Sequence, residues 1–119
     1  MIKPESVRIH ALSFPEVEET SNKNVLSFQV QEKVFATLNS AENRACLRFS
    51  PIDQQAFCSF PNTPFFPVPN AWGKHGWTLV DLARADEEML IGALTTAYCE
   101  VAPKNLAAPF LEIDLDEED

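Results

Sequence analysis

The chain has 119 residues, of which 45% are apolar and 23% are charged; this composition predicts one globular domain and excludes an intrinsically disordered chain. Its formal net charge of −9 argues against a strong nonspecific DNA-binding protein, which would carry a basic excess. No apolar run approaches the roughly 18 to 20 residues that a membrane-spanning helix needs.

The negative charge is concentrated near the C-terminal end of the sequence. No lysine or arginine follows Lys104, whereas residues 112–119 carry six acidic side chains. Removing these six from the 18 acidic residues leaves 12 against 9 basic residues, so positions 1–104 have a net charge of −3. We therefore predict a single domain over residues 1–108 and a flexible acidic tail over residues 109–119.

The sequence also bears on the compartment in which the protein works. The first ten residues, MIKPESVRIH, lack the apolar run that follows the basic region of a secretory signal. The cysteines, Cys46, Cys58 and Cys99, are odd in number and form no C-x-x-C pair. Both observations predict a cytoplasmic protein with reduced, mostly buried thiols.

A short helix is predicted at the N-terminus. Pro4 suits the first turn of a helix, where its missing N–H costs nothing. Apolar residues line roughly one side up to about residue 13, and Pro15 then ends the helix because the residue before a proline avoids helical geometry. The following segment, EVEETSNKN (residues 16–24), is polar and is predicted to be irregular.

Three strand-like runs come next: VLSFQV (25–30), KVFATLN (33–39) and RACLRFS (44–50). They alternate apolar with polar residues and are rich in β-branched and aromatic side chains, as half-buried strands are. The short connections predict hairpins and an antiparallel meander. In the third run we expect Leu47 and Phe49 to point inward, with Arg44, Cys46 and Arg48 on the opposite face.

A helix is predicted to follow the third strand. Ser50 and Pro51 form a helix-start signature, an N-cap residue followed by proline at the first helical position. In this helix we expect Ile52, Ala56 and Phe57 to be buried.

Four prolines between residues 59 and 76 predict a loop, in which FFPV (65–68) is at most a short edge strand. GWTLVDL (76–82) is predicted to be a strand. The last element is a helix capped by Asp86, with acidic residues in its first turn and apolar residues at helical spacing up to Pro103. The fold class is therefore α+β: an antiparallel sheet of about five strands, flanked by helices at both termini and with one helix between strands.

Several of these pieces together resemble the MmcQ/YjbR family: LSFPEVEET, VLSFQVQEKVFATLN, LRFSPIDQQAF and HGWTLVDLARADEEMLIGALTTAYCEVAPKNLA. The resemblance runs from about Val7 to Ala108. It implies a small α+β fold similar to frataxin-like (CyaY-like) domains, with hairpins in a double-wing arrangement. Members of the family are commonly labelled DNA-binding, and the resemblance implies no set of catalytic residues.

The loop NAWGKHGW (70–77) is the first candidate for a functional site, because binding residues are often carried on loops. One hypothesis is weak DNA binding, in which cations contact phosphates and Trp72 offers a stacking face. The candidate residues lie on this loop and at the hairpins: Lys33, Arg44, Arg48, Trp72, Lys74 and His75. For Trp77 we favour a structural position in the core at the start of a strand.

A second hypothesis is a module that binds a protein or a small ligand and does not bind DNA. The segment 60–77 is rich in prolines and aromatic residues, and aromatic side chains give a large contact area at low entropic cost. Phe65, Phe66 and Trp72 would be the anchors of such a pocket.

Catalysis and a bound metal or cofactor are not expected. His10 and His75 lie in distant segments, and neither has metal-ligand spacing to a cysteine or a carboxylate. A glycine-rich phosphate loop and paired carboxylates are also missing from the sequence. The acidic tail lacks the glycine turn of a calcium loop; folded back, it could screen Arg44, Arg48 and Lys74.

Overall fold

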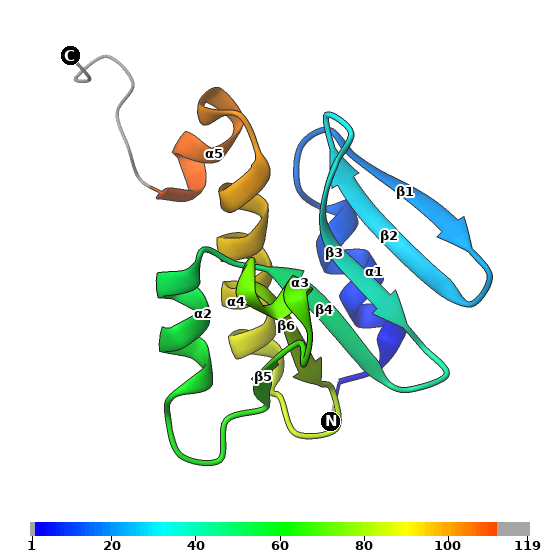
Figure 1. Cartoon of the computed structure of the whole chain (residues 1–119). Coiled ribbons are helices and arrows are strands. Elements are labelled where there is room, and N and C mark those ends of the chain that lie inside the picture. The colour runs from blue at the N-terminus through cyan, green and yellow to red at the C-terminus, as the bar shows by residue number, and fades with distance from the viewer. Residues whose placement is uncertain (1, 112–119) are drawn as a thin grey trace.

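The computed structural model describes residues 2–111, which form a six-stranded antiparallel sheet and five helices (Figure 1). The strands are β1 (Val17–Asn22), β2 (Val25–Val30), β3 (Lys33–Asn39), β4 (Arg44–Arg48), β5 (Phe65–Pro67) and β6 (Trp77–Asp81). The helices are α1 (Pro4–Leu12), α2 (Pro51–Cys58), α3 (Ala71–Lys74), α4 (Glu87–Val101) and α5 (Lys104–Leu111). In the sheet the strand order is β1-β2-β3-β4-β6-β5, and the predicted α+β class is confirmed.

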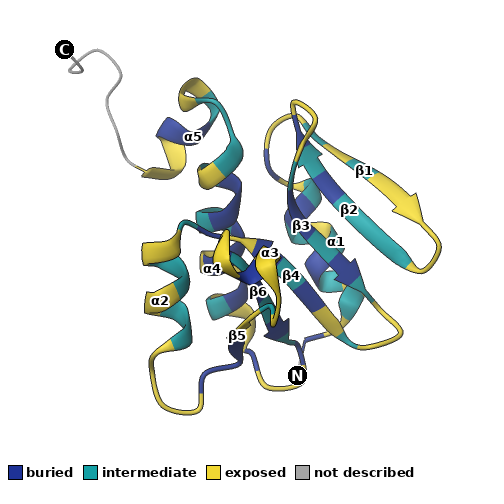
Figure 2. Ribbon diagram, viewed as in Figure 1, coloured by how far each residue is buried: buried dark blue, intermediate teal, exposed yellow. Residues whose placement is uncertain are grey.

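The two faces of the sheet are covered unequally. Helices α1 and α4 lie across one face and form the core with it, whereas the small helix α3 lies on the other face, which we call the open face (Figure 1). Buried positions follow the inner sides of β2, β3, β4 and α4, while most of α3 and of β1 is exposed (Figure 2).

A β-bulge in β3 helps to fill the core. The pairing of β2 with β3 shifts between Phe28, which faces Ala36, and Gln29, which faces Val34. Phe35 is the extra residue, and it is fully buried together with Ala36. Its ring and the Tyr98 ring of α4 form a T-shaped pair, with 5.6 Å between their centroids.

The predicted helix caps are confirmed. The Ser50 side chain accepts a hydrogen bond from the backbone N–H of Asp53 at 3.1 Å, and the Asp86 side chain accepts one from Met89 at 2.7 Å. These bonds satisfy N–H groups that have no partner within the first turn of a helix.

Three elements were not predicted. The polar segment expected to be irregular contains β1, an edge strand that pairs with β2 over six residues. Loop residues 71–74 form the single turn α3, and the chain resumes a helix, α5, directly after Pro103.

The burial predicted for α2 was wrong at two positions. Ile52 is 79% exposed and Ala56 is also exposed, because α2 packs at the side of the sheet beside β5. Its contact with the core is made by Phe57, which stacks on Phe49 at 4.7 Å between ring centroids.

The predicted acidic tail lies mostly outside the described residues. Residues 109–111, assigned to that tail from the sequence, form the last turn of α5. The six acidic side chains of residues 112–119 fall beyond the part of the chain that the structure describes.

Candidate functional site

The open face of the sheet is assembled from alternate residues of β3, β4 and β6. In β6 Thr78 and Val80 are fully buried on the core side, so Trp77, Leu79 and Asp81 lie on the open side. The placement of Trp77 in the core was therefore wrong. Trp77 does begin a strand, but its half-buried side chain belongs to the open face.

The pairing of the strands fixes the neighbours of Trp77 on this face. Arg48 of β4 is its cross-strand partner. Two residues back along β4, Cys46 lies between Leu79 of β6 and Thr37 of β3. The sequence correctly put Arg44, Cys46 and Arg48 on one face of β4.

Helix α3 is held against this face by several hydrogen bonds. The Asn70 side chain accepts a bond from the backbone N–H of Trp72 at 2.9 Å. From α2, the Gln54 side chain donates to the carbonyl oxygens of Gly73 at 2.9 Å and Trp77 at 3.1 Å. Gly73 packs so closely that a Cβ on it would lie 1.8 Å from the carbonyl oxygen of Val68. The position of α3 is thus fixed by its own N-cap residue, by a side chain of α2 and by close backbone packing.

This arrangement brings the two tryptophans of the chain together. The rings of Trp72 and Trp77 are nearly perpendicular, at 78°, with centroids 6.4 Å apart. With Thr37, Cys46 and Val68 they line a hollow of about 290 Å³, which we call the tryptophan hollow. Trp72 is 63% exposed, an unusual position for so large an apolar side chain.

A second hollow lies further along the same face. It has a volume of about 320 Å³ and is lined by Glu42, Asn43, Arg44, Phe66, Leu79, Val80 and Asp81. Leu79 of this hollow is the cross-strand partner of Cys46 in the tryptophan hollow, so the two hollows adjoin. The guanidinium carbon of Arg84 lies 5.5 Å from the centroid of the Phe66 ring.

The predicted aromatic anchors do not form one pocket. Phe65 is fully buried in the core and contacts Phe57 and Phe49, so it cannot reach a ligand. Phe66, the next residue, is 43% exposed on the opposite side of β5. Trp72 and Phe66 line the two different hollows.

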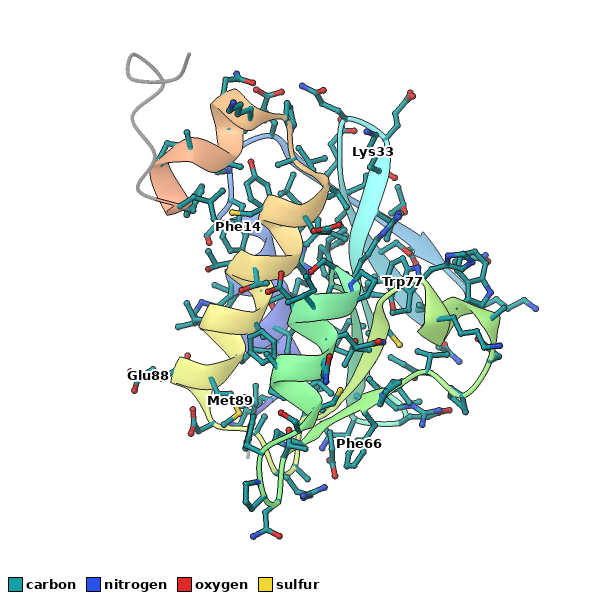
Figure 3. The ribbon with its side chains drawn as sticks, turned by 60° about the vertical axis from the view of Figure 1, so that its left-hand side comes forward. Phe14, Lys33, Phe66, Trp77, Glu88 and Met89 are labelled. Atoms are coloured by element: carbon teal, nitrogen blue, oxygen red, sulfur yellow. The ribbon has the colours of Figure 1, made fainter. Side chains whose placement is uncertain are left out.

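The predicted DNA-binding residues are only partly brought together. Arg44 and Arg48 lie at opposite ends of β4, and Arg44 is paired with Glu42 and faces Asp81. Lys33 begins β3 beside the β2–β3 turn, apart from Trp77 (Figure 3). Around the tryptophans there remain Arg48 and, at the end of α3, Lys74 and His75.

The thiol in the tryptophan hollow is not an activated nucleophile. Burial raises the pKa of Cys46, and the opposing effects of Thr37 and Arg44 are smaller. Burial likewise raises the pKa of Cys58 and of Cys99. Since the thiolate is the reactive form, these positions favour structural cysteines.

The described part of the chain offers no metal site. Residues 2–111 contain no cluster of three or more histidine, cysteine or acidic side chains placed to hold a metal ion. In the same range no helix is both long and apolar enough to cross a membrane.

Sequence reasoning missed part of the site. It selected Trp72, but it did not select Thr37, Val68 or Gln54 as residues of the site. The outward alternation in β3 and β4 was a usable signal for Thr37 and Cys46. The signal for Val68 and Gln54 was absent, because their roles depend on how the 59–76 segment folds back over the sheet.

Comparisons with known proteins agree on the fold. Residues 12–100 match the family model YjbR. The crystal structure of Deinococcus radiodurans protein DR2400, described as a DUF419 domain, superposes with a TM-score of 0.72 at 20% sequence identity. The match covers 92% of this chain and 88% of that one. A search of curated proteins found no match.

Proposed function

This chain belongs to the YjbR family, and from that premise we propose that it is a binding module that accepts an apolar group between Trp72 and Trp77. The observation that carries the proposal is the exposure of Trp72 above a hollow lined by apolar surface. A tryptophan that gains little from its own fold is available to a ligand.

The chemistry of the hollow favours binding over catalysis. Its lining consists of two indoles, an isopropyl group, a threonine and a poorly ionised thiol. Indole rings bury a large area and prefer edge-to-face or offset contacts with another aromatic ring. The two indole rings form nearly perpendicular walls of the hollow, and an aromatic ligand can make one such contact with each ring.

The rigidity of the wall also supports a binding role. Trp72 stands on a helical turn fixed by Asn70, by Gln54 of another helix and by the close packing of Gly73 on Val68. Because the backbone that carries Trp72 is held in place before binding, less entropy is lost when a ligand arrives.

The test uses the indole N–H signals of the protein in ¹H–¹⁵N NMR spectra. Both tryptophans lie at the hollow, so both signals report on it. We expect phenylacetamide, a neutral aromatic probe, to shift both signals with a dissociation constant on the order of 1 mM. Trp72→Ala should abolish the shift of the Trp77 signal. The matched control is Ile52→Ala, which removes an exposed apolar side chain from α2 and should change nothing.

The proposal fails if the indole signals do not move at saturating probe. It also fails if Trp72→Ala binds the probe as the parent chain does.

Weak binding of duplex DNA is a second candidate. Its support is the position of Arg48, Lys74 and His75 around an exposed tryptophan, together with the DNA-binding label implied by the family resemblance. Against it stand the net charge of −3 over residues 1–104 and the pairing of Arg44 with Glu42.

Fluorescence anisotropy of labelled duplex DNA over a salt series separates the two candidates. A chain shortened after Leu111 loses six acidic residues and should bind more tightly than the full chain if they screen the cations. Binding that falls steeply with salt and weakens in the Arg48→Gln, Lys74→Gln double variant supports DNA binding. A lack of binding by both chains at low salt excludes it.

A further inference from the structure

We infer that the ligand of the tryptophan hollow is a small apolar carboxylate, whose ring or chain lies against the tryptophans and whose charge is received by Arg48. This inference rests on the proposed function, because it adds the chemistry of the ligand to the same site.

The first argument is the register of the strands. Arg48 of β4 and Trp77 of β6 are directly opposite each other, so their side chains rise from the same face of the sheet. Opposite residues in an antiparallel pair have Cβ atoms about 4.5–5.5 Å apart. Cys46, two residues earlier on the same strand, already lines the hollow. Arg48 therefore stands at its rim.

The second argument is that Arg48 lacks a partner in the described part of the chain. Its side chain is exposed, and within residues 2–111 it takes part in no hydrogen bond, ion pair or cation–π contact. Arg8 bonds Glu19 at 2.6 Å, Arg44 bonds Glu42, and Arg84 donates to two backbone carbonyls. Arg48 is thus the described arginine whose guanidinium is available to an anion.

The third argument is the distribution of charge along the open face. At one end Arg44 is compensated by Glu42 and faces Asp81. At the other end β4 and α3 with its C-cap carry Arg48, Lys74 and His75, beside the thiol of Cys46. Among β4, β6 and α3, the end that carries the tryptophans is therefore the positive end.

The fourth argument concerns size. A volume of about 290 Å³ is at the lower limit of pockets that hold small molecules, and it is lined mainly by apolar groups with few polar ones. A guanidinium presents a planar pair of donors that matches the two oxygens of a carboxylate. A ligand whose ring fills the hollow and whose carboxylate is one or two bonds from that ring fits both the apolar lining and the guanidinium of Arg48.

The experiment compares two probes that differ in charge: phenylacetate and phenylacetamide. Both are titrated into the ¹⁵N-labelled full chain at low salt, with the indole signals as the readout. We expect phenylacetate to bind about three- to five-fold more tightly, as for an exposed ion pair with good geometry. In Arg48→Gln this preference should disappear, because phenylacetate loses more affinity than phenylacetamide does. Arg44→Gln, the matched control on the same strand, should keep the preference.

The outcomes distinguish this inference from the proposed function. If both probes bind the parent chain equally, the carboxylate inference fails and the proposed function stands. If neither binds, the proposed function itself fails. A preference that survives Arg48→Gln but is lost in Lys74→Gln would assign the anion to α3 and overturn the role of Arg48. Since Arg48 is exposed, an unchanged thermal unfolding temperature will show that its variant is folded.

Discussion

Gly76 lies against the backbone of Phe49 so closely that a Cβ on Gly76 would be 1.8 Å from the Phe49 carbonyl oxygen. The backbone N–H of Phe49 also donates to the carbonyl oxygen of Gly76 at 3.0 Å. With a φ of +99°, Gly76 has a conformation that other residues rarely adopt. This contact joins the end of β4 to the start of β6, where Arg48 and Trp77 face each other.

We expect Gly76→Ala to lower the free energy of unfolding by more than about 2 kcal/mol, because backbone atoms cannot move aside as a flexible side chain can. Gly92→Ala is the matched control, since a Cβ at Gly92 in α4 meets nothing within 4 Å. It should stabilise the protein by about 0.5–1 kcal/mol. Urea unfolding of both variants checks the pair, and equal effects would contradict the close packing at Gly76.

Phe65 and Phe66 are neighbours in β5 with opposite roles. Phe65→Ala should lower the free energy of unfolding by about 3–5 kcal/mol, because it leaves a cavity beside Phe49 and Phe57. Phe66→Ala should cost less than about 1 kcal/mol, since the side chain is on the open face and 43% exposed. Chemical denaturation measures both, and a large loss at Phe66 would place it in the core.

The β2–β3 turn carries two non-glycine residues with positive φ, Gln31 at 49° and Glu32 at 67°. Turns of this kind favour glycine at the second position. We expect Glu32→Gly to raise the free energy of unfolding by about 0.5–1 kcal/mol. The same type of change in the exposed part of α2, Gln55→Gly, should lower it by about 1 kcal/mol. Destabilisation by Glu32→Gly, measured in urea, would contradict the turn geometry.

Alkaline pH should lower the free energy of unfolding, because the Tyr98 phenol and the three cysteine thiols are partly or fully shielded from water. Burial raises the pKa of the phenol of Tyr98 and the pKa values of the three thiols above their ordinary values. The unfolded chain therefore loses these protons first, so the stabilisation is complete below about pH 8.5 and is lost as the pH rises further. Urea unfolding at pH 7.5, 9 and 10 measures the decline, and Cys46→Ala should make it shallower.

The hydroxyl of Tyr98 links α4 to the connection between α1 and β1. It donates a hydrogen bond to the carbonyl oxygen of Pro15 at 2.8 Å, and its ring stacks on Phe14 at 4.7 Å between centroids. Tyr98→Phe keeps the ring and leaves a carbonyl without its donor, so we expect a loss of about 1–2 kcal/mol in the free energy of unfolding. Thermal unfolding at pH 7.5 checks this, and no change would mean that water replaces the hydroxyl fully.

Most of the fold could be predicted because its elements carry strong local signals. β2 and β3 were predicted with their observed bounds from alternation and from their β-branched and aromatic content, and α4 followed from its cap and its apolar spacing. β1 could not be predicted, since its residues are almost all polar and its strand is defined by pairing with β2. α5 was missed because Pro103 ends one helix while another begins at Lys104.

The site was less predictable because it depends on long-range placement. The sequence selected Trp72 as a candidate, yet it placed Trp77 in the core and paired Trp72 with Phe65 and Phe66. Only the register of β4 with β6 puts Trp77 beside Arg48, and only the fold of residues 68–74 brings Trp72 over it. Local sequence patterns carry no information on either of these two long-range contacts.

The edge strand β1 has a consequence for how copies of this protein meet. Glu19 points toward the helical side of the sheet, where the Arg8 side chain donates to it at 2.6 Å, and most other residues of β1 are exposed and polar. At the opposite edge β5 has three residues and ends in Pro67, which lacks an N–H. A foreign strand added at β1 meets charged and polar side chains, and one added at β5 finds few bonding positions. The sheet is therefore protected at both margins against growth from one molecule to the next.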